Sequence, residues 1–134
     1  MRSMNLNECK VAISPAEKKK ARAKVQAQRL AQRVEVQLVN LPKYSKEFSF
    51  HPERRWRFDY AWTEIKVALE IHGGVFTNGR HTRGKGFTED KVKMNSAQLL
   101  DWIVIEATAA QVKSGDMLVW INKAIAKRNN DASN

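Results

Sequence analysis

Two short runs with a strand-like pattern stand next to each other in the middle of the chain. The first covers residues 57 to 62 (RFDYAW) and the second covers residues 66 to 71 (KVALEI). Aromatic, aliphatic and β-branched residues dominate both runs, and strands favour such residues because they pack well on a pleated surface. Thr63 and Glu64 break the pattern between the runs. We therefore predict a hairpin of two antiparallel strands.

Two further segments have the pattern of strands. Residues 47 to 50 form a short predicted strand after a polar connection, and residues 51 to 54 (HPER) have the composition of a turn. Together with the hairpin, this strand predicts a three-stranded antiparallel meander. Residues 102 to 107 (WIVIEA) are almost continuously apolar, which is typical of a strand covered on both faces. We expect this last strand to pair parallel to a central strand.

Helical periodicity marks the segment from residue 14 to residue 39. Ser14 is the predicted N-cap, Pro15 suits the first helical position, and Glu17 has the place of the capping-box acid. The apolar stripe of this helix consists of Val25, Leu30, Val34 and Leu38. One side of the helix should pack, while the other stays basic.

Two later helices complete the predicted order α-β-β-β-α-β-α, and the predicted fold class is α/β. The first should begin with Thr88 as N-cap and continue to about Leu100, and its buried side is marked by Val92, Leu99 and Leu100. The second follows residues 114 to 116, and its apolar positions are Leu118, Ile121, Ala124 and Ile125. Helices should therefore flank the sheet.

Length and composition favour one domain. The 134 residues are 43% hydrophobic, which is enough for a single core. We expect a flexible N-terminal segment at residues 1 to 13, one domain at residues 14 to 128, and a disordered tail at residues 129 to 134. The chain contains no secretory signal pattern and no apolar run of about 18 residues, so a cytoplasmic protein without a membrane segment is expected. The lone Cys9 excludes an internal disulfide.

The formal net charge of +10 is concentrated in two segments. Residues 10 to 33 hold eight Lys or Arg against one Glu, and residues 80 to 93 hold five against two acids. Such a basic excess suits a polyanion, because Lys and Arg bind phosphates with release of counterions. Nucleic acid is therefore the leading expected partner. The alternatives are a solvated helix face and a helix on a membrane surface.

Asp59 and Glu70 are the candidate catalytic acids. Each belongs to one strand of the predicted hairpin, and both lie in apolar or aromatic surroundings where an unpaired charge is costly. Two carboxylates, helped by the main-chain carbonyl of Ile71, could hold magnesium for phosphodiester hydrolysis. The alternative is that both acids are merely solvated on exposed strand faces.

These residues also carry a resemblance to a known family. The strings FDYAW and KVALEIHGG, then GRH, a helix with Lys93 and Asn95, and LLDWIVIEAT resemble the PD-(D/E)XK, or restriction-endonuclease-like, nuclease superfamily, nearest to its very-short-patch-repair-like branch. The resemblance covers roughly residues 44 to 126. It implies a restriction-endonuclease-like α-β-β-β-α-β core with a mixed sheet and an extra C-terminal helix. It also implies Mg²⁺-dependent cleavage of DNA that leaves a 5′-phosphate, with Mn²⁺ as a substitute, and an origin in phages or mobile elements.

On that resemblance Asp59 takes the place of the motif's Asp, and Glu70 takes that of its (D/E). The chain departs from the motif at His72, where the superfamily usually has lysine. His72 could act as a general base or outer ligand, or it could be an innocent residue at a strand end. Lys93 on the following helix is a second candidate for the missing lysine. His81 resembles the position of histidines that this branch places near the scissile phosphate.

Four basic residues are the candidate phosphate contacts, with solvated surface as the alternative for each: Arg80, Arg83, Lys85 and Lys91. The sequence thus predicts a Mg²⁺-dependent endodeoxyribonuclease that hydrolyses phosphodiester bonds. One alternative is a nucleic-acid-binding module that has kept the fold and lost catalysis. Another is a protein whose basic helix binds an acidic partner. Double-strand cleavage would favour a homodimer.

Overall fold

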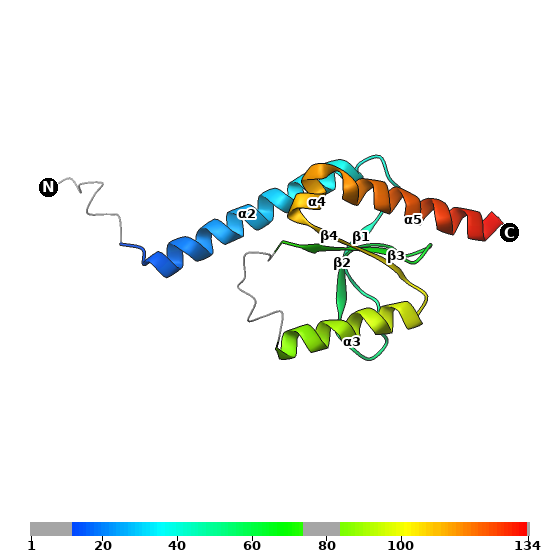
Figure 1. The fold of residues 1–134 in the computed structure, drawn as a ribbon, viewed down its shortest axis with the longest axis horizontal. Helices are drawn as coiled ribbons and strands as arrows, with labels where there is room; N and C mark the ends of the chain where they lie inside the picture. The colour runs from blue at the N-terminus through cyan, green and yellow to red at the C-terminus, as the bar shows by residue number, and fades with distance from the viewer. Residues whose placement is uncertain (1–11, 74–83, 134) are drawn as a thin grey trace, which may run out of the picture.

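A four-stranded sheet with helices on both faces forms the part of the chain that the computed structural model describes, residues 12–73 and 84–133 (Figure 1). The elements in chain order are α2 (Pro15–Leu38), β1 (Ser45–Ser49), β2 (Arg57–Trp62), β3 (Val67–His72), α3 (Lys85–Leu99), β4 (Ile103–Thr108), α4 (Ala109–Ser114) and α5 (Asp116–Ser133). The predicted α/β class and the mixed sheet flanked by helices are confirmed.

The strands lie in the order β1-β2-β3-β4. β1, β2 and β3 form the predicted antiparallel meander, and β4 pairs parallel to β3 with Glu70 beside Glu106. A turn joins β2 to β3, and the N–H of Ile65 donates to the carbonyl of Trp62 at its start. The parallel β4 is reached through α3, because parallel neighbours need a crossover connection.

One face of the sheet packs against α2, α4 and α5 (Figure 1). Its core includes Trp62, Leu69 and Ile121 from these layers, and the indole N–H of Trp62 donates to the carbonyl of Pro42 at 2.8 Å. The capping box predicted at Ser14 is present, since Ser14 Oγ accepts from the N–H of Glu17 at 3.1 Å. This face supplies most of the hydrophobic stabilisation.

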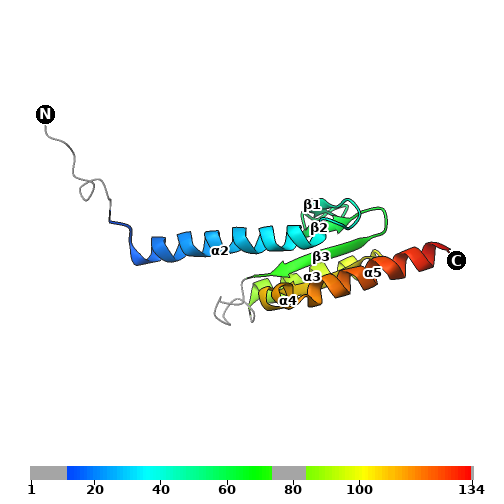
Figure 2. The same cartoon turned by 90° about the horizontal axis from the view of Figure 1, so that it is seen from above.

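Only the C-terminal part of α2 joins that core. Leu30 packs against it and Val34 and Leu38 are buried, as predicted, but Val25 is exposed together with all of residues 12 to 29. The helix therefore continues past the sheet as a free segment (Figure 2). The stripe predicted from periodicity is a packing surface over only half of its length.

α3 covers the opposite face and is positioned differently from the prediction. It begins at Lys85 after an N-cap at Gly84, so Thr88 lies inside the helix and is not its N-cap. Met94 and Ala97 are buried, whereas Val92 is exposed and Leu99 is 84% exposed. The helix turns Lys93, Met94 and Ala97 toward the sheet, and Ala97 meets the small side chains of Ala61 and Ala68 there. The predicted apolar side of α3 was therefore wrong for Val92 and Leu99, whereas Leu100 is partly buried and packs against the cluster on this face.

β4 is an edge strand, and as predicted both of its faces are covered. Ile103, Ile105 and Ala107 pack in the core with α5, and Val104 packs in the cluster with Ala97 of α3.

Two differences concern the C-terminal half. The short helix α4 was not predicted, and it begins with a capping box between Thr108 and Gln111. α5 remains helical to Ser133, where fraying was predicted from Asn129. Within the described ranges no helix is long and apolar enough to cross a bilayer.

Candidate active site

The two candidate acids lie where β2 and β3 separate. The pairing of these strands runs from Trp62↔Val67 to Tyr60↔Leu69 and ends there. Beyond this point β2 continues alongside β1, and β3 continues alongside β4. Asp59 and Glu70 are thus the first residues inside an opening of the sheet, which we call the fork.

Each carboxylate in the fork accepts a hydrogen bond from the opposite strand. The backbone N–H of Asp59 donates to Glu70 Oε1 at 3.2 Å, and the N–H of Ile71 donates to Asp59 Oδ2 at 2.7 Å. The side chains therefore take the place of backbone carbonyls where the ladder stops. These bonds hold both carboxylates in the gap between the strands.

The neighbouring ladder is also interrupted at Asp59. The β1–β2 register passes from Lys46↔Tyr60 directly to Phe48↔Phe58, and the backbone of Glu47 between them has a φ of 50°. A positive φ is uncommon for a residue with a side chain. This kink leaves Asp59 outside both ladders of β2, so its side chain can turn into the fork.

Lys93 reaches the fork from α3. Its Nζ lies 3.1 Å from Glu70 Oε1 and 5.8 Å from the centre of the Phe58 ring. One helical turn later, Ala97 packs in the same cluster as Ala68 of β3, and residues four apart share a helix face. The structure therefore brings Asp59, Glu70 and Lys93 together, although they come from three different elements.

Glu70 has the perturbed electrostatics of the cluster. Burial raises the pKa of its carboxyl, and the negative charge of Asp59 raises it further. Lys93 and the N–H of Asp59 act in the opposite direction but do not cancel the rise in pKa. The fork thus holds two acids against one lysine in a site largely withdrawn from water, and an additional cation there would be favourable.

The donor atoms of the fork fit a hard divalent cation. No hydrogen bond from the described residues reaches Asp59 Oδ1 or Glu70 Oε2. The carbonyl of Ile71 faces the same side as its N–H, toward Asp59, because both groups of a strand residue point the same way. In residues 12–73 and 84–133 no three His, Cys, Asp or Glu side chains gather as a metal cluster. Mg²⁺ needs only one or two carboxylates when waters and substrate oxygens complete its shell.

His72 lies beside the fork and pairs with a residue that sequence reasoning missed. Its Nε2 is 2.8 Å from Glu106 Oε1 on β4, and both side chains are about half exposed. The parallel register places Glu106 next to Glu70 in the sheet. The available signal was that Glu106 is the single charge within the apolar run WIVIEA. The histidine is therefore held by a carboxylate and does not contact the acidic pair directly.

Two of the four predicted phosphate contacts lie among the residues that the structure describes. Lys85 begins α3 and Lys91 follows on the same helix; both are exposed, and Lys91 Nζ lies 4.7 Å from the centre of the Phe87 ring. Lys93 is the basic residue of this helix that turns inward to the fork. The predicted Arg80, His81 and Arg83 lie outside the described residues.

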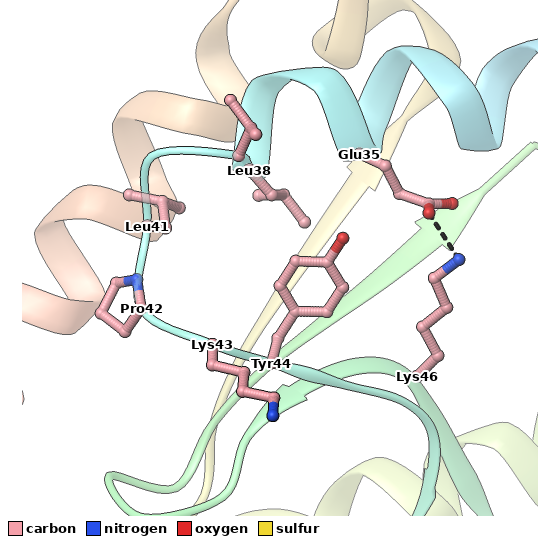
Figure 3. A pocket seen from close by; sticks show the side chains of 8 residues that line it. Glu35, Leu38, Leu41, Pro42, Lys43, Tyr44 and Lys46 are labelled. Atoms are coloured by element: carbon pink, nitrogen blue, oxygen red, sulfur yellow. Dashed lines mark ion pairs between the residues drawn. The ribbon is translucent and has the colours of Figure 1, made fainter.

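A pocket of about 560 Å³ lies on the other face of the sheet (Figure 3). It is lined by Glu35, Leu38, Val39, Leu41, Pro42, Lys43, Tyr44 and Lys46. Glu35 pairs with Lys46 at its edge and accepts a hydrogen bond from the hydroxyl of Tyr60 at 3.2 Å. Of the predicted catalytic residues that the structure describes (Asp59, Glu70, His72 and Lys93), none lines this pocket, so it is separate from the fork.

Comparison of the chain with models of known protein families, with curated proteins and with solved structures finds no match. The candidate site is therefore defined by its own geometry: two opposed carboxylates and a lysine in an opening of the sheet, with a histidine–carboxylate pair next to them. Such a set can hold a hard cation and neutralise the charge of a phosphoryl group.

Proposed function

We propose that the protein is a metal-dependent endodeoxyribonuclease whose fork hydrolyses phosphodiester bonds. One observation carries the proposal: Lys93 lies 3.1 Å from buried Glu70, across the fork from Asp59. The order of β1, β2, β3, α3 and β4 after α2 supports membership of the restriction-endonuclease-like superfamily, because it is the α-β-β-β-α-β order that the resemblance implies. The basic net charge of +10 supports DNA as the partner.

Asp59, Glu70 and the carbonyl of Ile71 would hold Mg²⁺, with Mn²⁺ as a substitute. When bound, such an ion polarises the scissile phosphate and activates a water for attack. The Lys93 ammonium neutralises negative charge that develops on the phosphoryl oxygens. This lysine thereby fills, from α3, the role that the superfamily motif gives to a lysine two residues after the second acid.

The pair of His72 and Glu106 supplies the second group of the proposed site. Glu106 fixes the orientation of the imidazole through Nε2, which leaves Nδ1 available to accept a proton. Lys85 and Lys91 on α3 contact the flanking phosphates as point charges. The protein residues thus provide charge neutralisation, a proton acceptor and backbone contacts.

Cleavage of a panel of labelled DNAs tests the proposal. Linear, nicked, mismatched, four-way and single-stranded DNA are incubated with Mg²⁺, Mn²⁺ or EDTA. We expect metal-dependent cutting that falls by more than about 100-fold in Asp59→Asn and Glu70→Gln, since even outer partners of metal ligands contribute about 10- to 100-fold. Glu35→Gln is the matched control and should cut like the wild type, because Glu35 lies on the other face of the sheet.

A nucleic-acid-binding module without catalysis is the second candidate. It is favoured by His72, which stands where the superfamily has lysine and is engaged by Glu106 rather than by Glu70. If the protein and all its variants bind DNA but cut none of it with any metal, the binding function is supported and the nuclease function is excluded. Metal-dependent cutting that Asp59→Asn and Glu70→Gln leave unchanged would place the chemistry elsewhere.

A further inference from the structure

The free segment of α2 carries a dense group of basic residues outside the fork. Residues 15 to 29, which we call the arm, form a continuous helix in which every residue is exposed. The arm holds one acid, Glu17, and six basic residues: Lys18, Lys19, Lys20, Arg22, Lys24 and Arg29. No packing against the rest of the described chain accounts for this helix.

Two contacts fix the direction of the arm. Four residues after the end of α2 at Leu38, the carbonyl of Pro42 accepts a hydrogen bond from Trp62, which lies at the hairpin end of β2. At the other end of the packed part, Leu30 lies against Gly73, and a side-chain carbon placed on Gly73 would be 3.1 Å from Leu30 Cδ2. Gly73 directly follows β3, so the arm leaves the core at the open end of the fork (Figure 2).

Three of the six basic residues of the arm form a stripe that continues into the packed part of α2. Lys18, Arg22 and Arg29 of the arm and Arg33 beyond it are spaced by four, seven and four residues, which places them on one helix face. All four are exposed, whereas Val34 on another face is buried. At 1.5 Å per residue the stripe is about 22 Å long, and this length corresponds to roughly seven base pairs of duplex DNA.

A polyanion is the partner that this charge pattern fits. Like charges four residues apart, such as Lys18 with Arg22 and Lys20 with Lys24, repel each other and destabilise a free helix. An isolated helix of this length is only marginally stable in water. Phosphates would remove the repulsion, whereas the arm of a second copy of this chain would add to it. A helical stripe with phosphate contacts along one face matches a stiff duplex better than a flexible single strand.

We propose that the arm binds the backbone of duplex DNA on one side of the phosphate held in the fork. This inference rests on the proposed function, because the fork provides the reference point for the DNA. It defines the substrate as a duplex that extends at least about seven base pairs on the arm side. Lys18, Arg22 and Arg29 are the phosphate contacts.

Equilibrium binding separates the arm from general charge effects. Wild type, the arm variant Lys18→Gln/Arg22→Gln/Arg29→Gln and the control variant Lys113→Gln/Lys123→Gln/Lys127→Gln are titrated with duplex DNA in Ca²⁺ over a range of salt concentrations. Both triple variants remove three exposed positive charges and leave the fork intact. We expect the slope of log K against log salt to fall by about 2.7 and the affinity at 0.1 M salt to fall roughly 100-fold, only in the arm variant. Circular dichroism confirms that both variants keep their helices.

The possible outcomes test DNA binding by the arm separately from DNA cleavage by the fork. Wild-type affinity and slope in the arm variant, or equal losses in both triple variants, would overturn the role of the arm. A dimer in solution that the arm variant converts to monomer, with unchanged DNA affinity, would overturn it as well. DNA bound through the arm but never cleaved would support the arm and remove the nuclease function.

A length series gives the second readout. Duplexes are shortened on one side of the cleavage site at a time, and single-turnover rates are compared. We expect the wild-type rate to drop once the arm side is shorter than about seven base pairs. The arm variant should be slow with every length and show no such threshold. A wild-type rate that is independent of length on both sides would overturn the proposed substrate.

Discussion

Among the residues that the structure describes, each face of the sheet has one lysine–glutamate pair, and the two pairs have different environments. On the α2 face, the side chains of Lys46 and Glu35 are 55% and 30% exposed. On the α3 face, those of Lys93 and Glu70 are 15% and 11% exposed. Solvent screens the first pair, so it contributes little to stability. The second pair is largely removed from water, and the loss of hydration offsets much of its attraction.

The difference indicates why the buried pair exists. A fold stabilised only by packing would place apolar residues at Glu70 and Lys93, as it does at Trp62 and Leu69 on the other face. Instead Asp59 adds a second acid, which raises the pKa of Glu70 together with burial. In the exposed pair, the hydrogen bond from Lys46 to Glu35 raises the pKa of the lysine, as expected for an ordinary ion pair. Packing alone therefore does not account for the buried cluster, in agreement with the chemical role that we propose for it.

The largest expected contrast is in cleavage rate. Lys93→Met should reduce cleavage about 100- to 1,000-fold, the range found when one group that stabilises developing charge is removed. Lys46→Met removes the same charge on the other face and should leave the rate unchanged. Single-turnover cleavage with saturating DNA measures both. Equal cleavage rates for the two variants would contradict a specific role of the buried pair in cleavage.

The same two variants should differ in stability. Lys93→Met leaves Glu70 buried without its cation, and this should lower the free energy of unfolding by about 3 kcal/mol at neutral pH. Glu70→Gln/Lys93→Met should recover most of that loss, because no buried charge of the pair remains. Urea denaturation followed by tryptophan fluorescence measures these values. A Lys93→Met protein as stable as Lys46→Met would show that the burial of Glu70 is not electrostatically important.

The pair beside the fork should have a smaller effect. His72→Ala and Glu106→Gln should each slow cleavage about 10- to 100-fold, as expected for groups that assist or orient the reacting ones. If Glu106 acts only through His72, the double variant should be no slower than His72→Ala. Rates of the three variants over a range of pH provide the measurement. Additive losses would instead give Glu106 an independent role.

Stability should depend on pH through Glu70. Its pKa in the folded protein is above the ordinary value of 4.5, so the folded state holds a proton that the unfolded state has already lost. The free energy of unfolding therefore falls as pH rises from about 4.5 through the raised pKa, and is constant above it. Glu70→Gln should remove this fall, and Mg²⁺ should oppose it in the wild type. Urea denaturation between pH 4 and pH 9, in roughly unit steps, tests the difference.

Local patterns were sufficient for the strands that form the fork. The predicted strand at residues 57 to 62 matches β2, and the predicted strand at residues 66 to 71 differs from β3 by one residue at each end. Their separation by a short turn placed Asp59 opposite Glu70. The cap at Ser14 was equally local and was also predicted correctly.

Features that depend on contacts between distant segments were not predictable in this way. The buried side of α3 is set by Ala97 and Lys93 against β3, not by the periodicity that favoured Val92 and Leu99. Glu106 has a partner only because β4 is in parallel register with β3. The extent to which α2 packs depends on where the sheet ends. No periodicity within one segment contains that information.

The position of a bound metal ion tests the central claim most directly. Crystals of the wild type and of Glu70→Gln are soaked in Mn²⁺, and anomalous difference maps locate the ion. The account predicts one peak in the fork of the wild type, at about 2.1 Å from oxygens of Asp59 and Glu70, and no peak there in the variant. A fork without a peak at saturating Mn²⁺, or a peak that Glu70→Gln leaves unchanged, would contradict it.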